Sequence, residues 1–104
     1  MTWFLVDASG YRYPLATAGL HIGRAGENDI VLVDEEASRR HAFVALQGEE
    51  AWLHDQNSFN GVFVNDARLA QPQRLRHGDL IRLGQSQLRA EWVAGPQLPA
   101  ASAP

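Results

Sequence analysis

Short apolar stretches alternate with polar turns along most of the chain. The pattern is clearest in residues 80–83 and 87–92, where every second residue is apolar: Ile81, Leu83, Leu88, Ala90 and Trp92. Alternation with a period of two predicts antiparallel strands that bury one face. No window carries an apolar stripe with the period of a helix. About ten such strands with turn residues between them predict an all-β sandwich or barrel.

The expected strands are short, and they end at turn residues. They cover residues 3–6, 11–13, 20–22, 30–33, 42–46, 51–53, 62–64, 80–83 and 87–92. Pro14 marks an edge or a strand end, because proline cannot donate a ladder hydrogen bond. From Gly95 the composition changes to Pro, Ala and Ser, which is typical of a linker or a disordered tail. We therefore expect one domain over residues 1–94 and a tail over residues 95–104 that leads to a further C-terminal region.

Length and composition fit a single small globular domain. The chain has 104 residues, 45% hydrophobic and 20% charged, and no apolar run approaches the ~20 residues that span a bilayer. The amino terminus lacks the features of a signal peptide, so we expect a cytoplasmic protein without membrane insertion. Without cysteine there are no disulfides and no thiolate metal ligands. The net charge of −3 argues against nucleic acid as a partner.

All nine basic residues are arginines, and several stand near predicted strand ends. Residues 23–24 (Gly-Arg), 38–40 (Ser-Arg-Arg) and 58–61 (Ser-Phe-Asn-Gly) lie in such loops, and alternate loops of a sandwich gather at one end. Arginine grips phosphate bidentately, while hydroxyls and loop N–H groups add donors. These segments can therefore form a local anion site. The alternative is that the arginines are solvated charges paired with the acidic run 34–36.

Two other kinds of site follow from the residue types. Ser38, His41 and Asp55 are the residues of a catalytic triad, but no oxyanion or substrate feature accompanies them. The four histidines, at positions 21, 41, 54 and 77, are scattered and lack the paired spacing of metal ligands. The acidic residues do not follow a calcium-loop pattern. We expect no enzyme activity, no metal and no cofactor.

Five motifs occur in order along the chain: Gly23-Arg24, Asn28-Asp29-Ile30, Ser38-Arg39-Arg40-His41-Ala42, Asp55 with residues 58–65, and Leu75 with residues 78–84. Together they resemble the forkhead-associated (FHA) domain. The resemblance implies a sandwich of two twisted antiparallel sheets with about 10–11 strands, both termini at one end and binding loops at the other. It also implies a module without catalytic activity that binds segments containing phosphothreonine.

The resemblance further assigns ligand-binding roles. Arg24 and Ser38 would hold the phosphate, and Asn60 would hydrogen-bond the backbone of the bound segment beside the phosphothreonine. Arg39 would contact that backbone or the phosphate. Phosphothreonine carries a charge of about −1.5 to −2 and three strong acceptor oxygens, whereas unphosphorylated threonine offers Arg24 nothing comparable. Binding is therefore expected to depend on phosphorylation.

Three further residues match structural positions of the family, where glycine permits close backbone approach and histidine braces the loops: Gly23, Gly61 and His41. One ligand-facing position departs from the family pattern. Phe59 stands where a Thr or Ser usually donates another hydrogen bond to the phosphate, a bond worth about 1.5–3 kcal/mol. Affinity is expected to fall unless Arg39 or Ser58 compensates, and Phe59 can instead make an apolar contact with the ligand.

We therefore expect a module that recruits Thr-phosphorylated proteins or peptides. A Ser/Thr kinase or its substrate is a candidate partner, because the motifs look bacterial and bacterial modules of this kind accompany such kinases. Specificity beyond phosphothreonine is expected to depend on Arg40, Asn57 and Phe59. The alternative is an FHA fold that serves as a phospho-independent interaction or scaffold module, which Phe59 would favour.

Overall fold

The computed structural model describes residues 2–93, and the tail expected over residues 95–104 lies outside them. The described chain forms eleven strands: β1 (Thr2–Val6), β2 (Arg12–Pro14), β3 (Leu20–Gly23), β4 (Ile30–Val31), β5 (Ala42–Gln47), β6 (Glu50–Asp55), β7 (Val62–Val64), β8 (Ala67–Arg68), β9 (Gln73–Arg74), β10 (Leu80–Leu83) and β11 (Ser86–Val93). Within residues 2–93 there is no helix long and apolar enough to cross a membrane. The all-β prediction is confirmed.

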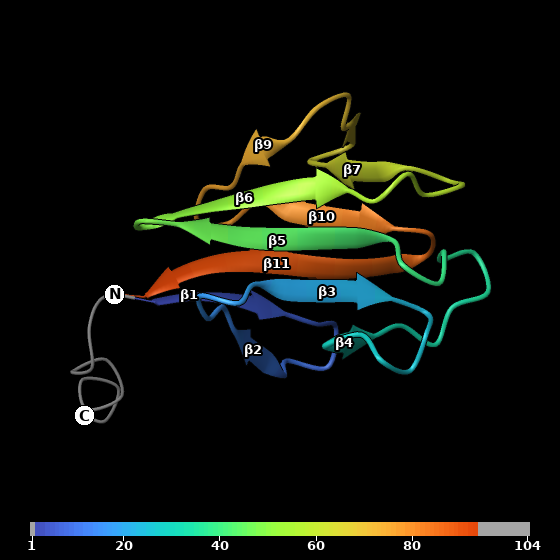
Figure 1. Cartoon of the computed structure of the whole chain (residues 1–104), viewed down its shortest axis with the longest axis horizontal. Coiled ribbons are helices and arrows are strands. Elements are labelled where there is room, and N and C mark those ends of the chain that lie inside the picture. The colour runs from blue at the N-terminus through green and yellow to red at the C-terminus, as the bar shows by residue number, and fades with distance from the viewer. Residues whose placement is uncertain (1, 94–104) are drawn as a thin grey trace.

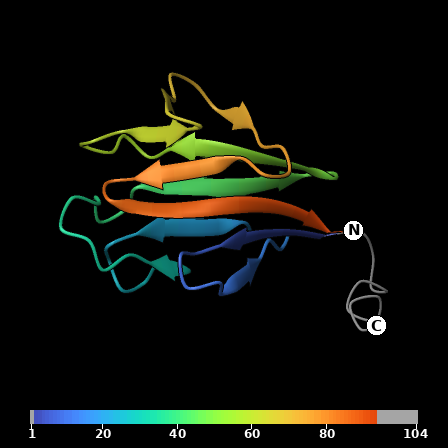
Figure 2. The same cartoon turned by 180° about the vertical axis from the view of Figure 1, so that it is seen from behind.

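The strands form two sheets packed face to face, seen from opposite sides in Figures 1 and 2. Six strands follow the order β2-β1-β11-β10-β7-β8, and five follow the order β4-β3-β5-β6-β9. The expected sandwich is confirmed with one correction: β3 and β4 are parallel, pairing Ile22 with Ile30 and Gly23 with Val31. The loop of residues 24–29 carries the chain back along β3, so that β4 runs in the same direction.

The core lies between the sheets and takes alternate residues from each long strand. In β10 and β11 the predicted alternation is confirmed, since Ile81, Leu83, Leu88 and Ala90 are all 1% exposed or less. Leu53 of β6 meets them from the other sheet and is fully buried. Burying one such aliphatic side chain contributes about 1.5–3 kcal/mol. The core therefore fixes the register of the strands whose ends carry the loops.

The β-branched run 30–33 forms a shorter strand than predicted. β4 ends at Val31, and Val33 is completely exposed. Leu32 is buried and donates its backbone N–H to the carbonyl oxygen of Gly23 at 2.8 Å. The pattern is misleading here because an exposed valine at a loop start carries the same sequence signal as a strand residue.

The hydrophobic pattern does not predict β8 and β9. All of their residues are exposed, so neither strand buries an apolar face that the hydrophobic pattern could reveal. β8 follows a tight turn in which Asn65 and Asp66 adopt φ values of 50° and 71°. Two consecutive left-handed residues form the kind of turn that suits a two-residue hairpin. Turn chemistry, rather than hydrophobicity, therefore creates β8.

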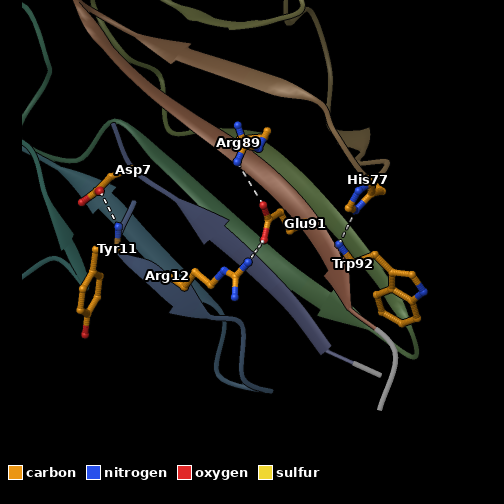
Figure 3. Close-up of polar contacts among 7 residues, drawn as sticks. All are labelled: Asp7, Tyr11, Arg12, His77, Arg89, Glu91 and Trp92. Atoms are coloured by element: carbon orange, nitrogen blue, oxygen red, sulfur yellow. Dashed lines mark hydrogen bonds and ion pairs between the residues drawn. The ribbon is translucent and has the colours of Figure 1, made fainter. Parts of the chain in front are cut away.

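Polar contacts link β11 to β2, across the intervening β1, and to the loop before β10 (Figure 3). Glu91 of β11 is 13% exposed and pairs with Arg12 of β2 at 3.2 Å and with Arg89 at 3.1 Å. The N–H of Trp92 donates to Nδ1 of His77 at 3.0 Å, which joins β11 to the loop before β10. Exposed ion pairs contribute little on their own, so these contacts supplement the core.

The loops after β3, β4, β6 and β10 lie at one end of the sandwich, on the right in Figure 1. Thr2 and Val93 pair across β1 and β11 at the other end. The expectation of binding loops at one end of the fold, away from the ends of the described chain, agrees with this arrangement.

Asp34 connects the β4–β5 loop to the β10–β11 turn of the opposite sheet. Its Oδ2 accepts hydrogen bonds from the backbone N–H of Gln85 at 2.7 Å and the hydroxyl of Ser86 at 2.8 Å. Its Oδ1 accepts from the N–H of Glu36 at 2.9 Å. Gly84 has φ +64°, and a Cβ there would lie 2.9 Å from Oδ2 of Asp34. The glycine therefore lets the loop rest against the turn.

Asp34→Ala should destabilise the fold at neutral pH, and the effect should diminish in acid. Partial burial opposes ionisation, but hydrogen bonds from Glu36, Ser86 and Gln85 outweigh it and hold the pKa of Asp34 below its ordinary value of 3.8. A lowered folded-state pKa stabilises the fold above the unfolded pKa, and this stability is lost as pH falls through the folded value. Urea unfolding of both proteins at neutral pH and well below pH 3.8 measures the difference. An equal difference at both values would contradict the assignment.

Candidate functional site

Close backbone contact brings the β3–β4 and β4–β5 loops together. The N–H of Arg24 donates to the carbonyl oxygen of Ser38 at 2.9 Å, and the N–H of Ala25 donates to that of Arg39 at 3.1 Å. Gly23 lies directly under this junction, where an added Cβ would collide with the carbonyl oxygen of Arg39. Only glycine leaves the two backbones room to approach this closely.

His41 is the fully buried polar residue beneath these loops. Its Nδ1 accepts a hydrogen bond from the backbone N–H of Ser38 at 3.0 Å. Since that nitrogen is an acceptor, the other ring nitrogen carries the proton, and Nε2 donates to the carbonyl oxygen of Gly61 at 2.8 Å. One imidazole thus joins the β4–β5 loop to the β6–β7 loop.

Arg24 and Ser38 present polar groups with unused bonding capacity. The guanidinium of Arg24 is held at one corner, where Nε donates to the carbonyl oxygen of Ala37 at 3.1 Å. Within residues 2–93 its two Nη atoms make neither an ion pair nor a hydrogen bond. The Ser38 hydroxyl oxygen accepts the N–H of Phe59 at 2.9 Å, which leaves its own hydrogen free to donate. Both side chains are therefore anchored at one atom and keep unused donors.

The β6–β7 loop has its own internal bonds. The N–H of Ser58 donates to Oδ1 of Asp55 at 2.8 Å, and Oγ of Ser58 accepts the N–H of Gly61 at 3.0 Å. Nδ2 of Asn60 donates to the carbonyl oxygen of Glu36 at 2.8 Å. The amide oxygen of the exposed Asn60 makes no hydrogen bond to residues 2–93, so it remains available to a ligand.

The remaining arginines of the motif differ in their pairing. Arg40 forms a long ion pair of 3.4 Å with Glu27 between two exposed side chains. Arg39 is exposed and belongs to none of the ion pairs found in the described part of the chain. The alternative in which these arginines pair with the acidic run 34–36 is wrong for the described residues, because Asp34 and Glu36 contact Gln85 instead.

Phe59 lies at the tip of the β6–β7 loop with 89% of its surface exposed. Its backbone N–H bonds to Ser38, while its ring makes no aromatic or cation–π contact with residues 2–93. An exposed aromatic ring next to two free donors contributes nothing to the core. It is available for contact with another molecule.

Asn28 braces the site, although residue chemistry alone did not mark it as a site residue. It is 7% exposed, and its Nδ2 donates to the carbonyl oxygens of Ala25 and Arg39, both at 2.8 Å. Its Oδ1 is buried without a partner in residues 2–93. The position of Asn28 in the second of the five motifs is the signal that could have found it.

The catalytic-triad alternative is not supported by the geometry. His41 bonds to the backbone N–H of Ser38 rather than to its hydroxyl, and Nε2 bonds to a carbonyl oxygen. Asp55 accepts from the N–H of Ser58 and does not contact the imidazole. Among residues 2–93, no three His, Asp or Glu side chains gather as they would around a metal ion.

Comparison with known proteins identifies the family. A model of the FHA domain matches residues 20–84. The chain belongs to the FHA domain family. The matched range contains the loops that carry Arg24, Ser38 and Asn60.

Relatives and solved structures agree with this assignment. Over 88 residues the chain is 39% identical to the transcriptional regulatory protein EmbR of Mycobacterium tuberculosis. The aligned region covers 85% of this chain and 23% of EmbR. A structure of M. tuberculosis EmbR with a low-affinity phosphopeptide aligns with TM-score 0.84 and 36% identity over 90% of this chain and 25% of that one. The FhaA FHA domain, solved in complex with the intracellular domain of Rv3910, aligns with TM-score 0.81 and 37% identity. That alignment covers 86% of this chain and 99% of the FhaA chain.

His41→Ala should destabilise the domain by about 2–4 kcal/mol, because it leaves the N–H of Ser38 and the carbonyl of Gly61 unpaired and opens a cavity. Urea unfolding measures the loss. His54→Ala is the matched control, since His54 is half-buried but its imidazole makes no hydrogen bond within residues 2–93. Equal losses in the two variants would mean that the bridge does not stabilise the fold.

Proposed function

We propose that this FHA domain binds segments of partner proteins that contain phosphothreonine. The observation that carries the proposal is the pair of unused donors on Arg24 and Ser38, whose loops are joined by the hydrogen bond from the backbone N–H of Arg24 to the carbonyl oxygen of Ser38. A phosphate brings a charge of about −1.5 to −2 and three acceptor oxygens to this position. The two free Nη atoms of Arg24 can grip it as a fork, and the Ser38 hydroxyl adds a third donor.

Asn60 and Arg39 complete the proposed site. Asn60 is fixed by its bond to Glu36, and its free amide oxygen is suited to accept a backbone N–H from an extended segment. Arg39 is exposed in the same loop as Ser38, and we propose that it contacts either that backbone or the phosphate. Gly23, Gly61 and His41 act indirectly, because they hold the loops at the separation that a ligand requires.

The comparisons support a binding role rather than catalysis. EmbR and FhaA, whose FHA domains are similar to this one, have been solved with a phosphopeptide and with another protein's intracellular domain. We infer that the partner here is a Thr-phosphorylated protein or peptide, with a Ser/Thr kinase or its substrate as the first candidate. We also propose that residues 1–94 form the domain, that residues 95–104 link it to a further region, and that it works in the cytoplasm.

Arg24→Ala should weaken binding of a phosphothreonine peptide by roughly 10- to 100-fold, because each hydrogen bond to a charged group contributes about 1.5–3 kcal/mol. Ser38→Ala should weaken it by a smaller factor. Isothermal titration with matched phosphorylated and unphosphorylated peptides measures both effects. Arg74→Ala is the control, since Arg74 is equally cationic but pairs with Glu50 on another part of the surface. The proposal of phosphate recognition is wrong if the wild type binds the phosphorylated and unphosphorylated peptides equally, or if Arg24→Ala binds the phosphorylated peptide as tightly as the wild type.

A phospho-independent interaction module is the second candidate function. The observation that favours it is the exposed ring of Phe59, which stands where a hydroxyl would otherwise donate to the phosphate. An aromatic side chain supplies contact area at low entropic cost, as it does at many protein interfaces.

Phe59→Thr separates the two candidates. In a phosphate-binding site the new hydroxyl should tighten phosphopeptide binding about tenfold or more, in line with a charged hydrogen bond. In a phospho-independent interface the substitution should instead weaken binding of the natural partner by removing an aromatic contact. Titration of the variant and the wild type with the same phosphopeptide gives the sign, and unchanged or weaker affinity would favour the second function.

A further inference from the structure

Two arginines on the outer face of the six-stranded sheet converge on one aromatic ring. Phe63 of β7 stands opposite Arg82 of β10 on one side and opposite Arg68 of β8 on the other. The Cζ atoms lie 4.2 Å and 6.0 Å from the ring centroid for Arg82 and Arg68 respectively. The face of an aromatic ring attracts cations, so Phe63 holds both guanidiniums in place. We call Arg68 and Arg82 the arginine pair.

The arginine pair has no counter-charge in the described structure. Within residues 2–93 neither guanidinium lies within ion-pairing distance of a carboxylate, and neither donates a hydrogen bond. The other charged cluster on this face is different, because Glu91 neutralises part of the charge of Arg12 and Arg89 (Figure 3). Arg68 is exposed and Arg82 is half-buried. The chain therefore keeps two like charges together on a surface although its net charge is −3.

The arginine pair adjoins the phosphothreonine site. A Cβ built on Gly61 would lie 2.8 Å from Nε and 2.9 Å from Cζ of Arg68, so the guanidinium packs directly on this glycine. Gly61 follows Asn60 and accepts the hydrogen bond of His41 through its carbonyl oxygen. Asn60, the proposed backbone contact of the ligand, is thus followed directly by the glycine on which the guanidinium of Arg68 packs.

We propose that the arginine pair forms a second anion subsite, which binds a negatively charged side chain of the same phosphopeptide. This inference rests on the proposed function. A segment held at Asn60 passes Gly61 and brings its neighbouring side chains to Arg68. A chain in extended form advances about 3.3 Å per residue, so an anion a few residues from the phosphothreonine can reach the guanidinium. Either a carboxylate or a second phosphate supplies the chemistry that two unpaired arginines bind.

The selected partners are therefore Thr-phosphorylated segments with an acidic or doubly phosphorylated sequence. The arginine pair adds discrimination rather than most of the affinity, because it lies at the surface. A single carboxylate should strengthen binding about two- to fivefold, as measured for exposed ion pairs. A second phosphate, with its larger charge and three oxygens, should strengthen it about tenfold or more.

The test uses phosphothreonine peptides that differ at one neighbouring position, which carries Asn, Asp or phosphoserine and is moved stepwise along either side. Titration against the wild type and Arg68→Gln gives the affinity ratio between the charged and neutral peptides for each protein. We expect the wild type to prefer Asp and phosphoserine at one position and Arg68→Gln to lose most of that preference. A general loss of folding would weaken all peptides alike and leave the ratio unchanged.

Two further variants make the result specific. Arg68→Lys keeps the charge but loses the fork, so it should keep part of the preference for Asp and less of that for phosphoserine. Arg74→Gln removes the same charge from another two-residue edge strand and should keep the full preference. The subsite is refuted if the wild type binds phosphothreonine peptides without any preference, or if Arg68→Gln retains it. Failure of every phosphopeptide to bind would instead refute the proposed function, and the subsite with it.

Discussion

The binding end of this domain depends on a buried imidazole that makes two different hydrogen bonds at once. His41 accepts from the backbone of Ser38 with one nitrogen and donates to the carbonyl oxygen of Gly61 with the other. Only the neutral ring can do both, since the protonated ring has two donors and no acceptor. The two loops have no other link through a fully buried side chain in the described structure. This buried bridge sets the spacing of the two loops together with the bonds from the N–H of Phe59 to Ser38 and from Nδ2 of Asn60 to Glu36 nearer the surface.

The side chains of the proposed site are each anchored at one atom by a hydrogen bond to another loop, and their remaining polar atoms are unbonded in the described structure. Arg24 is anchored through Nε, Ser38 through its acceptor oxygen, and Asn60 through one amide hydrogen. Each anchor removes part of the side chain's freedom before a ligand arrives, which lowers the ordering cost of binding. The unused atoms are then donors on Arg24 and Ser38, which are proposed to hold the phosphate, and an acceptor on Asn60. Affinity in such a site comes from groups that are already in position.

Sequence patterns predict the fold well because the core obeys a strict period of two. Ile81, Leu83, Leu88 and Ala90 alternate in the sequence and are buried in the structure. Strand β8 escapes this reasoning, since both of its residues are exposed and its cause is the left-handed turn at Asn65.

The candidate site is predicted through short motifs, which mark residues but not their links. The bond between Asp34 and Gln85 joins positions 51 residues apart and has no local signal. The hydrogen bonds of the Asn28 amide and the contacts of the arginine pair with Phe63 also depend on which segments of the fold lie next to each other. Cross-strand neighbours follow from sheet order and register: the turn at Asn65 joins β7 to β8, but that Arg68 then lies beside Gly61 is visible only in the structure.

The pairing of Thr2 with Val93 has a mechanical consequence. Tension applied at these two residues pulls β1 and β11 apart from one end of their ladder, so their hydrogen bonds are loaded one after another rather than together. In this geometry the two strands separate by sequential rupture of their hydrogen bonds. The first contacts to break lie at the end of the sandwich opposite the loops, and the ligand-facing end is the last to feel the load.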